Sequence, residues 1–223
     1  MNEQFQRFAL LLTSEQIEKI DKAKVAVIGL GGVGSVATLA LARNGVKNFV
    51  LCDFDEVQIS NINRQLIANF NTIGMKKTDV CEKMIKEINP EANVTVISDR
   101  FGPETKLFDN DFDYLIDAID DLDNKCLLIK MCLERKKTFI SSMGTARKMD
   151  LTKLKIMDLN QTSYDPLARK LRKMLRDIGI YEKVPVVSSL EEPIKTMGLG
   201  SYMPVTSTAG LMLADYIIKK IIL

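Results

Sequence analysis

The sequence predicts an α/β protein whose core is a doubly wound, mostly parallel β-sheet. Three observations support this: short apolar runs alternate with amphipathic segments, a glycine-rich turn follows the first run, and carboxylates follow the ends of later runs. Strands of a parallel sheet read as such apolar runs, because helices bury them on both faces. With 223 residues, the chain is long enough for one sizeable domain and short for two.

The predicted elements alternate in a regular order. Thr13-Ser14-Glu15-Gln16 has the spacing of a capping box, so a short helix is expected over 14–21, ahead of a strand over 24–28. Small and apolar residues at helical spacing predict a helix over 33–44, which Gly45 would end. The same reasoning predicts strands over 48–53, 93–98, 114–118 and 138–142, and helices over 76–89 and 124–135.

The pattern changes near residue 150. We therefore divide the single domain (1–223) into a Rossmann-like core (1–150) and a substrate-side C-terminal extension (151–223). The extension is expected to contain a strand over 154–159 and a basic amphipathic helix that begins at Asp165-Pro166. The last segment, 203–223, is apolar but interrupted by Asp215, Lys219 and Lys220, which favours a buried helix over a membrane span.

Composition excludes several kinds of chemistry. The chain has no histidine, so a Ser–His or Cys–His catalytic pair and a His-ligated metal are excluded. Its four cysteines are scattered without a C-x-x-C pair, which predicts reduced thiols in the core of a cytoplasmic protein. No secretory signal is visible at the N-terminus. A net charge of +2 indicates that any nucleic-acid surface must be local.

The glycine-rich turn predicts a phosphate-binding loop. Gly29-Leu30-Gly31-Gly32-Val33-Gly34 lies between a predicted strand and a predicted helix, which is the context that a nucleotide fingerprint requires. Gly29 would permit the tight turn, Gly31 and Gly32 would let the main chain approach a phosphate, and Gly34 would let the helix pack on the sheet. Asp53 ends the next strand, where its carboxylate could accept hydrogen bonds from a ribose.

The residues that follow favour ATP over a nicotinamide cofactor. Arg64 and Lys77 would offset the charge of ATP phosphates and of a phosphorus transition state, so we predict a catalytic role for both. The predicted site also includes Asp55, Asn61 and Gln65.

Asp120 is the candidate magnesium ligand. Asp117-Ala118-Ile119-Asp120-Asp121 follows the fourth strand, at the carboxyl edge of the sheet where ligands bind in open α/β folds. A carboxylate there could hold Mg²⁺ together with substrate phosphates, which would make Asp120 the third catalytic residue. Asp120 could equally be a helix N-cap.

Taken together, these motifs resemble the E1-like adenylyltransferase superfamily, which includes ThiF, MoeB and HesA. The resemblance implies that Asp53 holds the ribose, that Asn61, Arg64 and Lys77 hold the phosphates, and that Asp120 carries magnesium. It also implies a homodimer, in which Arg7 reaches the ATP of the partner subunit.

Within that superfamily, the chain is similar to the tRNA threonylcarbamoyladenosine dehydratase branch. The similarity rests on residues 7–11, 61–65, 88–91, 114–120, 161–167 and 187–193. It implies that ATP adenylates the threonine carboxylate of a modified tRNA adenosine. The neighbouring ureido group then closes the ring and expels AMP, which needs proximity but no protein nucleophile.

Two further readings of the sequence stay open. The first is the activation of a ubiquitin-like sulfur carrier, which would use the same ATP site; a sulfurtransferase partner is also conceivable. The second is a non-catalytic nucleotide-sensing module, in which Arg64, Lys77 and Asp120 would be idle.

The basic helix is a candidate RNA contact. Four cations lie on one face of it at helical spacing, where they could contact tRNA phosphates: Arg169, Arg172, Lys173 and Arg176. An ordinary solvated face would have the same pattern.

Overall fold

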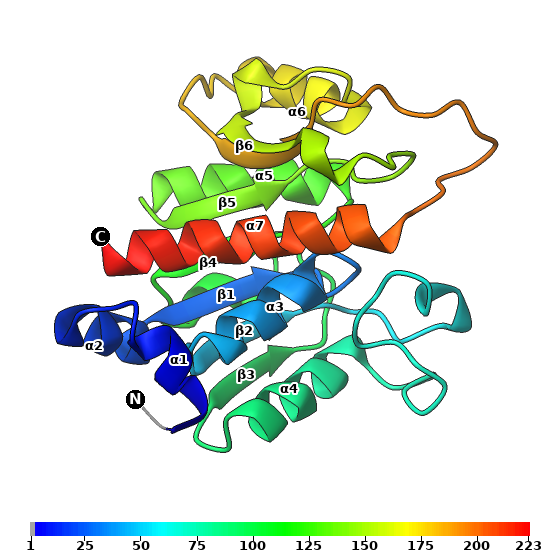
Figure 1. Cartoon of the computed structure of the whole chain (residues 1–223). Helices are drawn as coiled ribbons and strands as arrows, with labels where there is room; N and C mark the ends of the chain where they lie inside the picture. Colours follow the sequence, from blue (N-terminus) through cyan, green and yellow to red (C-terminus); the bar gives the residue numbers. More distant parts are fainter. Residues whose placement is uncertain (1–2) are drawn as a thin grey trace.

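The computed structural model of the chain, which describes residues 3–223, contains one seven-stranded sheet (Figure 1). The strand order is β3-β2-β1-β4-β5-β7-β6, and all neighbours are parallel except β6 and β7, which are antiparallel. The strands are β1 (Lys24–Ile28), β2 (Asn48–Cys52), β3 (Asn93–Ile97), β4 (Tyr114–Asp117), β5 (Thr138–Ser142), β6 (Leu154–Asp158) and β7 (Pro185–Ser189). The predicted doubly wound α/β fold is confirmed.

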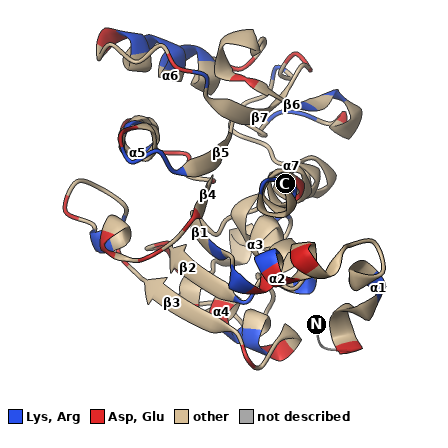
Figure 2. Ribbon diagram, turned by 90° about the vertical axis from the view of Figure 1, so that its left-hand side faces the viewer, with Lys and Arg blue, Asp and Glu red and all other residues tan. Residues whose placement is uncertain are grey.

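Helices cover both faces of this sheet (Figure 2). One face carries α2 (Ser14–Lys22), α3 (Gly34–Arg43), α4 (Lys77–Ile88) and α7 (Met203–Ile222), and the other carries α5 (Leu122–Glu134) and α6 (Pro166–Asp177). A single-turn helix, α1 (Gln6–Ala9), lies near the N-terminus. Each face buries its own apolar cluster, which explains why strands such as β1 are apolar on both sides.

The C-terminal helix is a core element, as its interrupted apolar pattern predicts. Val205, Ala209, Leu213 and Ile217 of α7 are buried. A Cβ at Gly210 would lie 2.5 Å from the Val33 carbonyl oxygen, so a glycine is needed where α7 crosses the start of α3. Within residues 3–223, no helix has the length and apolarity that a membrane crossing requires. The contact with α7 supports α3 directly behind the glycine-rich turn.

Strand β7 is the one strand within residues 3–223 that the sequence analysis missed. It begins at Pro185 and ends in two buried serines, Ser188 and Ser189, so its composition is not typical of a strand. Proline is tolerated here because it occupies the first position of the strand. The pairing of β7 with β5 attaches the extension to the core sheet.

The four cysteines lie in the core as unpaired thiols, as predicted. Cys52 also lines the cleft described below, so it is the cysteine closest to the candidate active site. Burial, together with the charge of Asp53 and Asp99, raises the pKa of the Cys52 thiol to about 12. The group is therefore protonated at neutral pH and does not serve as a nucleophile.

Candidate active site

A cleft of about 810 Å³ lies at the carboxyl ends of the parallel strands, between the core and the C-terminal extension. This is the edge at which open α/β sheets bind their ligands. Ten of the residues predicted from the sequence line it: Gly29, Gly31, Gly32, Asp53, Asp55, Asn61, Arg64, Gln65, Lys77 and Asp120. The structure thus brings these residues into one site, although the first and the last, Gly29 and Asp120, are 91 positions apart in the sequence.

The glycine-rich turn has the geometry expected of a phosphate-binding loop. Gly29 has a φ of +87°, and a Cβ there would lie 2.7 Å from the Ala118 carbonyl oxygen. A Cβ at Gly34, the first residue of α3, would lie 1.8 Å from the Gly29 carbonyl oxygen. At Gly31, by contrast, a Cβ would meet only the Gln65 amide nitrogen, at 3.8 Å. Gly29 and Gly34 are therefore required by the fold itself, whereas Gly31 leaves open space toward the cleft.

The Asp53 carboxylate is fixed at the end of β2 by two main-chain donors. Leu30 N donates to Asp53 Oδ2 at 2.6 Å, and Asp55 N donates to Oδ1 at 2.8 Å. Burial raises the pKa of Asp53, and the positive charge of Lys77 and these two N–H donors partly oppose that rise. The bond to Leu30 joins the acid to the glycine-rich turn, so one carboxylate orients both halves of the predicted nucleotide site.

Lys77 reaches the cleft from the first turn of α4. The residue is only 5% exposed, and its Nζ lies 2.8 Å from Asp55 Oδ2, whose side chain is about half exposed. The main-chain N–H of Lys77 also donates to the Asp55 carbonyl oxygen. A buried ammonium group with one solvated partner is well placed to bind a second anion.

Arg64 and Gln65 lie on the opposite side of the turn. Arg64 Nη1 donates to the Ser60 carbonyl oxygen at 2.7 Å and to Asn63 Oδ1 at 3.1 Å, and neither partner is charged. Gln65 is buried, and its Oε1 has no hydrogen-bond partner within residues 3–223. A buried amide oxygen without a partner is costly, which indicates that a donor from outside the protein completes this site.

Asp120 and Asp121 have different roles. Asp121 is the N-cap of α5: its Oδ1 accepts from Asn124 N at 3.0 Å, and its Oδ2 pairs with Arg100 at 3.2 Å. The alternative reading of Asp120 as the N-cap is therefore wrong. The Asp120 side chain is exposed in the cleft and makes no hydrogen bond or ion pair with residues 3–223.

Asp117 is structural. It is fully buried, and its Oδ2 accepts from Lys125 Nζ at 2.8 Å and from the Ser141 hydroxyl at 2.6 Å. Its Oδ1 accepts from Ile119 N at 3.2 Å, which shapes the loop that carries Asp120. The network joins β4, β5 and α5 beneath the floor of the cleft.

The loop after β5 and the extension together supply a second wall, which the sequence analysis did not identify. Arg147 and Lys148 line the cleft on the loop after β5. Arg147 Nε donates to the Gly198 carbonyl oxygen at 2.9 Å. Lys148 is 2% exposed and its Nζ donates to the carbonyl oxygens of Ser189 and Glu191. Burial lowers the pKa of Lys148. Ligands of open α/β sheets bind at the carboxyl ends of the strands, and this rule, which identified Asp120, applies equally to the loop after β5. It is therefore the signal by which Arg147 and Lys148 could have been identified from the sequence.

The charges that line the cleft leave it favourable to anions. Apart from Asp120, its carboxylates are engaged: Asp53, Asp55, Asp121 and Asp165 each accept a main-chain N–H or pair with a cation. Arg64, Arg147 and Lys148 have only uncharged oxygen partners among residues 3–223. Three cations without carboxylate partners, in a cleft that is also lined by the glycine-rich turn before α3, make a suitable site for a phosphate chain.

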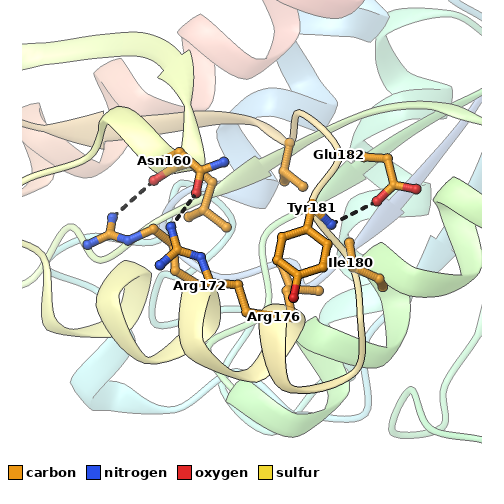
Figure 3. A pocket seen from close by; sticks show the side chains of 9 residues that line it. Asn160, Arg172, Arg176, Ile180, Tyr181 and Glu182 are labelled. Atoms are coloured by element: carbon orange, nitrogen blue, oxygen red, sulfur yellow. Dashed lines mark hydrogen bonds between the residues drawn. The ribbon is translucent and has the colours of Figure 1, made fainter.

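The other predicted residues do not line this cleft: Gly34, which the fold requires, Arg7, and the four cations of α6. Arg7 is exposed on α1 and does not line it, so its predicted role across a dimer stays a prediction. On α6, Arg169, Lys173 and Arg176 are exposed, whereas Arg172 is half-buried. Arg172 donates to the carbonyl oxygens of Leu159 and Thr162. Figure 3 shows Arg172 at the edge of a smaller pocket.

Residues 2–223 match the ThiF family. The chain is 44% identical over 196 residues to the tRNA threonylcarbamoyladenosine dehydratase of Bacillus subtilis, covering 87% of this chain and 77% of that protein. It is 42% identical over 139 residues to the Haemophilus influenzae protein of the same name, covering 61% of this chain and 53% of that protein.

A solved structure is similar over nearly the whole chain. The Escherichia coli tRNA N6-threonylcarbamoyladenosine dehydratase, TcdA, in complex with ATP superposes with a TM-score of 0.94 at 35% identity. The match covers 98% of this chain and 93% of that one. The family match over residues 2–223, the 44% identity and this superposition agree, and the chain belongs to the ThiF family.

Proposed function

We propose that the chain is an ATP-dependent tRNA-modifying enzyme that dehydrates threonylcarbamoyladenosine to its cyclic form. The observation that carries the proposal is the cleft itself, which combines a phosphate-binding loop and uncompensated cations with a second wall from the loop after β5 and the extension. The similarity to dehydratases of this name, one of them solved with ATP, supports the same substrate. A tRNA substrate also supports a cytoplasmic location.

The reaction proceeds in two steps that need no covalent bond to the protein. An oxygen of the threonine carboxylate attacks the α-phosphorus of ATP, and pyrophosphate leaves with the electron pair of the broken P–O bond. The ureido group then attacks the acyl carbon and loses a proton, and AMP leaves. The second step is intramolecular, so holding the adenylate in position suffices.

Each part of the cleft has a role in the first step. Asp53 accepts hydrogen bonds from the ribose, and the loop glycines bring main-chain N–H groups to the phosphates. Arg64 and Lys77 stabilise the negative charge that grows on the phosphorus oxygens, with Asn61 and Gln65 as neutral partners. Asp55 holds Lys77 in place. Arg147 and Lys148 line the cleft from the loop after β5, where they suit the carboxylate of the RNA substrate.

We include Mg²⁺ as a cofactor held by Asp120. No cluster of three or more His, Cys, Asp or Glu side chains within residues 3–223 could hold a metal by itself. The free Asp120 carboxylate nevertheless fits, because Mg²⁺ in nucleotide sites is usually held by one or two carboxylates together with substrate phosphates. Bound there, Mg²⁺ would neutralise phosphate charge.

Replacing Asp120 by asparagine tests this role. We expect Asp120→Asn to shift the Mg²⁺ concentration that gives half-maximal activity upward by at least about tenfold, because a neutral amide binds the cation weakly. Activity is measured in a magnesium titration at saturating ATP. Asp123→Asn, on α5 and outside the cleft lining, is the matched control. An unchanged titration curve for Asp120→Asn would remove it from the metal site.

A matched pair of glycine variants tests the phosphate-binding loop. Gly34→Ala forces a Cβ against the Gly29 carbonyl oxygen, so we expect a large loss of stability, about 3 kcal/mol or more. Gly31→Ala meets no protein atom closer than 3.8 Å and should unfold like the wild type, yet lose ATP affinity. Thermal unfolding and equilibrium ATP binding separate the two effects. Normal ATP binding by a folded Gly31→Ala protein would contradict the loop assignment.

The proposal includes a homodimer in which Arg7 reaches the ATP of the partner subunit. The exposed position of Arg7, away from its own cleft, supports action between chains rather than within one. A sulfurtransferase partner is a further part of the proposal, to be sought by co-purification.

Pyrophosphate exchange tests the choice of carboxylate. Labelled pyrophosphate should enter ATP when tRNA bearing threonylcarbamoyladenosine is present, and should not when the same tRNA carries unmodified adenosine. Exchange that depends instead on a ubiquitin-like protein with a free C-terminus would establish the sulfur-carrier reading. ATP binding without exchange under either condition would favour a nucleotide sensor.

A further inference from the structure

A second, smaller pocket lies on the C-terminal extension, between α6 and the loop that leads from α6 to β7 (Figure 3). It has a volume of about 160 Å³ and shares no lining residue with the larger cleft. Its apolar floor consists of Leu159, Leu175, Ile180 and Val184, and its rim consists of Asn160, Arg172, Arg176, Tyr181 and Glu182. Neither the fold nor the adenylation step accounts for such a rim.

The main chain that forms this pocket is well defined. Helix α6 ends in a Schellman motif: Ile180 N donates to the Leu175 carbonyl oxygen at 2.9 Å, and Gly179 N donates to that of Arg176 at 3.0 Å. Gly179 has a φ of +79°, which lets the chain reverse at this point. The reversal brings Tyr181 next to Arg176 at the mouth of the pocket (Figure 3).

Two guanidinium groups give the rim an excess of positive charge. Arg172 is held by the carbonyl oxygens of Leu159 and Thr162 and by the Thr162 hydroxyl, all through Nη1. Arg176 Nη2 donates to Asn160 Oδ1 at 3.2 Å. Neither forms an ion pair with a carboxylate of residues 3–223. Glu182, the one acid that lines the pocket, accepts from Tyr181 N at 2.9 Å. Each arginine therefore keeps free N–H donors for an anion.

Tyr181 adds an aromatic surface beside these cations. The residue is 73% exposed, and neither its ring nor its hydroxyl contacts a partner within residues 3–223. An accessible ring, an apolar floor and guanidinium donors are the groups that proteins use to hold an unpaired RNA base and its phosphate. A duplex would not fit, because its bases are stacked and covered.

The position of the pocket fits an RNA strand whose reacting nucleotide lies in the cleft. Pro166, the first residue of α6, lines the cleft, and Arg176 follows ten residues later, which is about 15 Å along the helix axis. Arg169 and Lys173 are exposed between these two points, and Figure 2 shows basic residues along α6. A single strand that leaves the cleft along α6 would therefore pass these cations and reach the pocket.

We propose that this pocket is a second nucleotide subsite, which holds an unpaired nucleotide of the RNA substrate at the far end of α6 from the reacting adenosine. Its base packs against Tyr181 over the apolar floor, and its phosphate lies at Arg172 and Arg176. The inference rests on the proposed function, because it requires an RNA substrate. It gives α6 a defined contact in place of a diffuse basic surface.

The experiment measures the binding of tRNA bearing threonylcarbamoyladenosine to the full chain over a range of salt concentrations, without ATP. Tyr181→Ala should weaken binding about 5- to 150-fold, the range for loss of one base–aromatic stack, and should leave the salt dependence unchanged. Arg176→Ala should make the negative slope of log K against log salt shallower by about 0.7, because one phosphate contact is lost. Tyr181→Phe keeps the ring and should bind like the wild type.

Controls separate this inference from the function on which it rests. Lys83→Ala removes an exposed cation from α4, on the other face of the sheet, and should change neither affinity nor slope. Thermal unfolding checks that each variant is folded. Wild-type affinity for Tyr181→Ala would overturn the subsite even if the wild type dehydrates its substrate. If Tyr181→Ala weakens tRNA binding as expected but the wild type does not dehydrate the tRNA, the proposed reaction is overturned and the RNA contact stands.

Discussion

Arg64→Ala should lower the rate of adenylation about 100- to 1000-fold while leaving the protein folded. The guanidinium group lies in the cleft, held by the Ser60 carbonyl oxygen and Asn63, and has no carboxylate partner within residues 3–223. Its charge is thus available to the phosphates, and removing one preorganised donor of this kind typically costs that factor in rate. The rate is read as pyrophosphate release in a single turnover at saturating ATP and tRNA.

The control for Arg64→Ala is Lys76→Ala. Lys76 is exposed next to Lys77 but does not line the cleft, so its removal changes the net charge equally without touching the site. We expect its single-turnover rate to stay within about twofold of the wild type, since surface charges contribute little at a distance. A rate for Arg64→Ala equal to that of Lys76→Ala would contradict the catalytic assignment.

Lys125→Met should destabilise the protein by about 3–5 kcal/mol. Lys125 and Asp117 are both fully buried and pair at 2.8 Å, so the substitution leaves a buried carboxylate without its counter-ion. The expected result in urea unfolding is a midpoint far below that of the wild type with an unchanged m-value. Because Asp117 also shapes the loop that carries Asp120, the folded fraction should bind Mg²⁺ less well.

The double variant Asp117→Asn with Lys125→Met identifies the cause. It removes both charges, while the amide oxygen can still accept from Ile119 N. Most of the lost stability should return, because the penalty comes from the uncompensated charge rather than from the missing contact. A double variant no more stable than Lys125→Met alone would show that side-chain packing, not charge, is the cause.

Much of the fold and of the nucleotide half of the site could be predicted from the sequence. The glycine-rich turn, Asp53 and Lys77 follow local rules, since each lies at a strand end or a helix start whose pattern is readable along the chain. The parallel topology then follows from the alternation of strands and helices.

The rest depends on contacts that periodicity does not encode. Strand β7 has a proline and two serines and is a strand because its partners bury it. Arg172 belongs to the predicted basic face, yet tertiary contacts with Leu159 and Thr162 hold it. Asp120 and Asp121 differ as N-cap candidates by a single position at the start of α5. Helix boundaries inferred from a sequence are uncertain by more than one residue, so the sequence could not decide between them.

The measurement that tests the central claim most directly is mass spectrometry of the RNA product. The protein is incubated with ATP, Mg²⁺ and tRNA bearing threonylcarbamoyladenosine, and the RNA is then digested under mild conditions. We predict a nucleoside lighter by one water, formed together with AMP and pyrophosphate, and absent when ATP is omitted. An unchanged nucleoside, from protein whose pyrophosphate exchange depends instead on a ubiquitin-like protein with a free C-terminus, would show that adenylation is correct and that the RNA carboxylate is not the substrate.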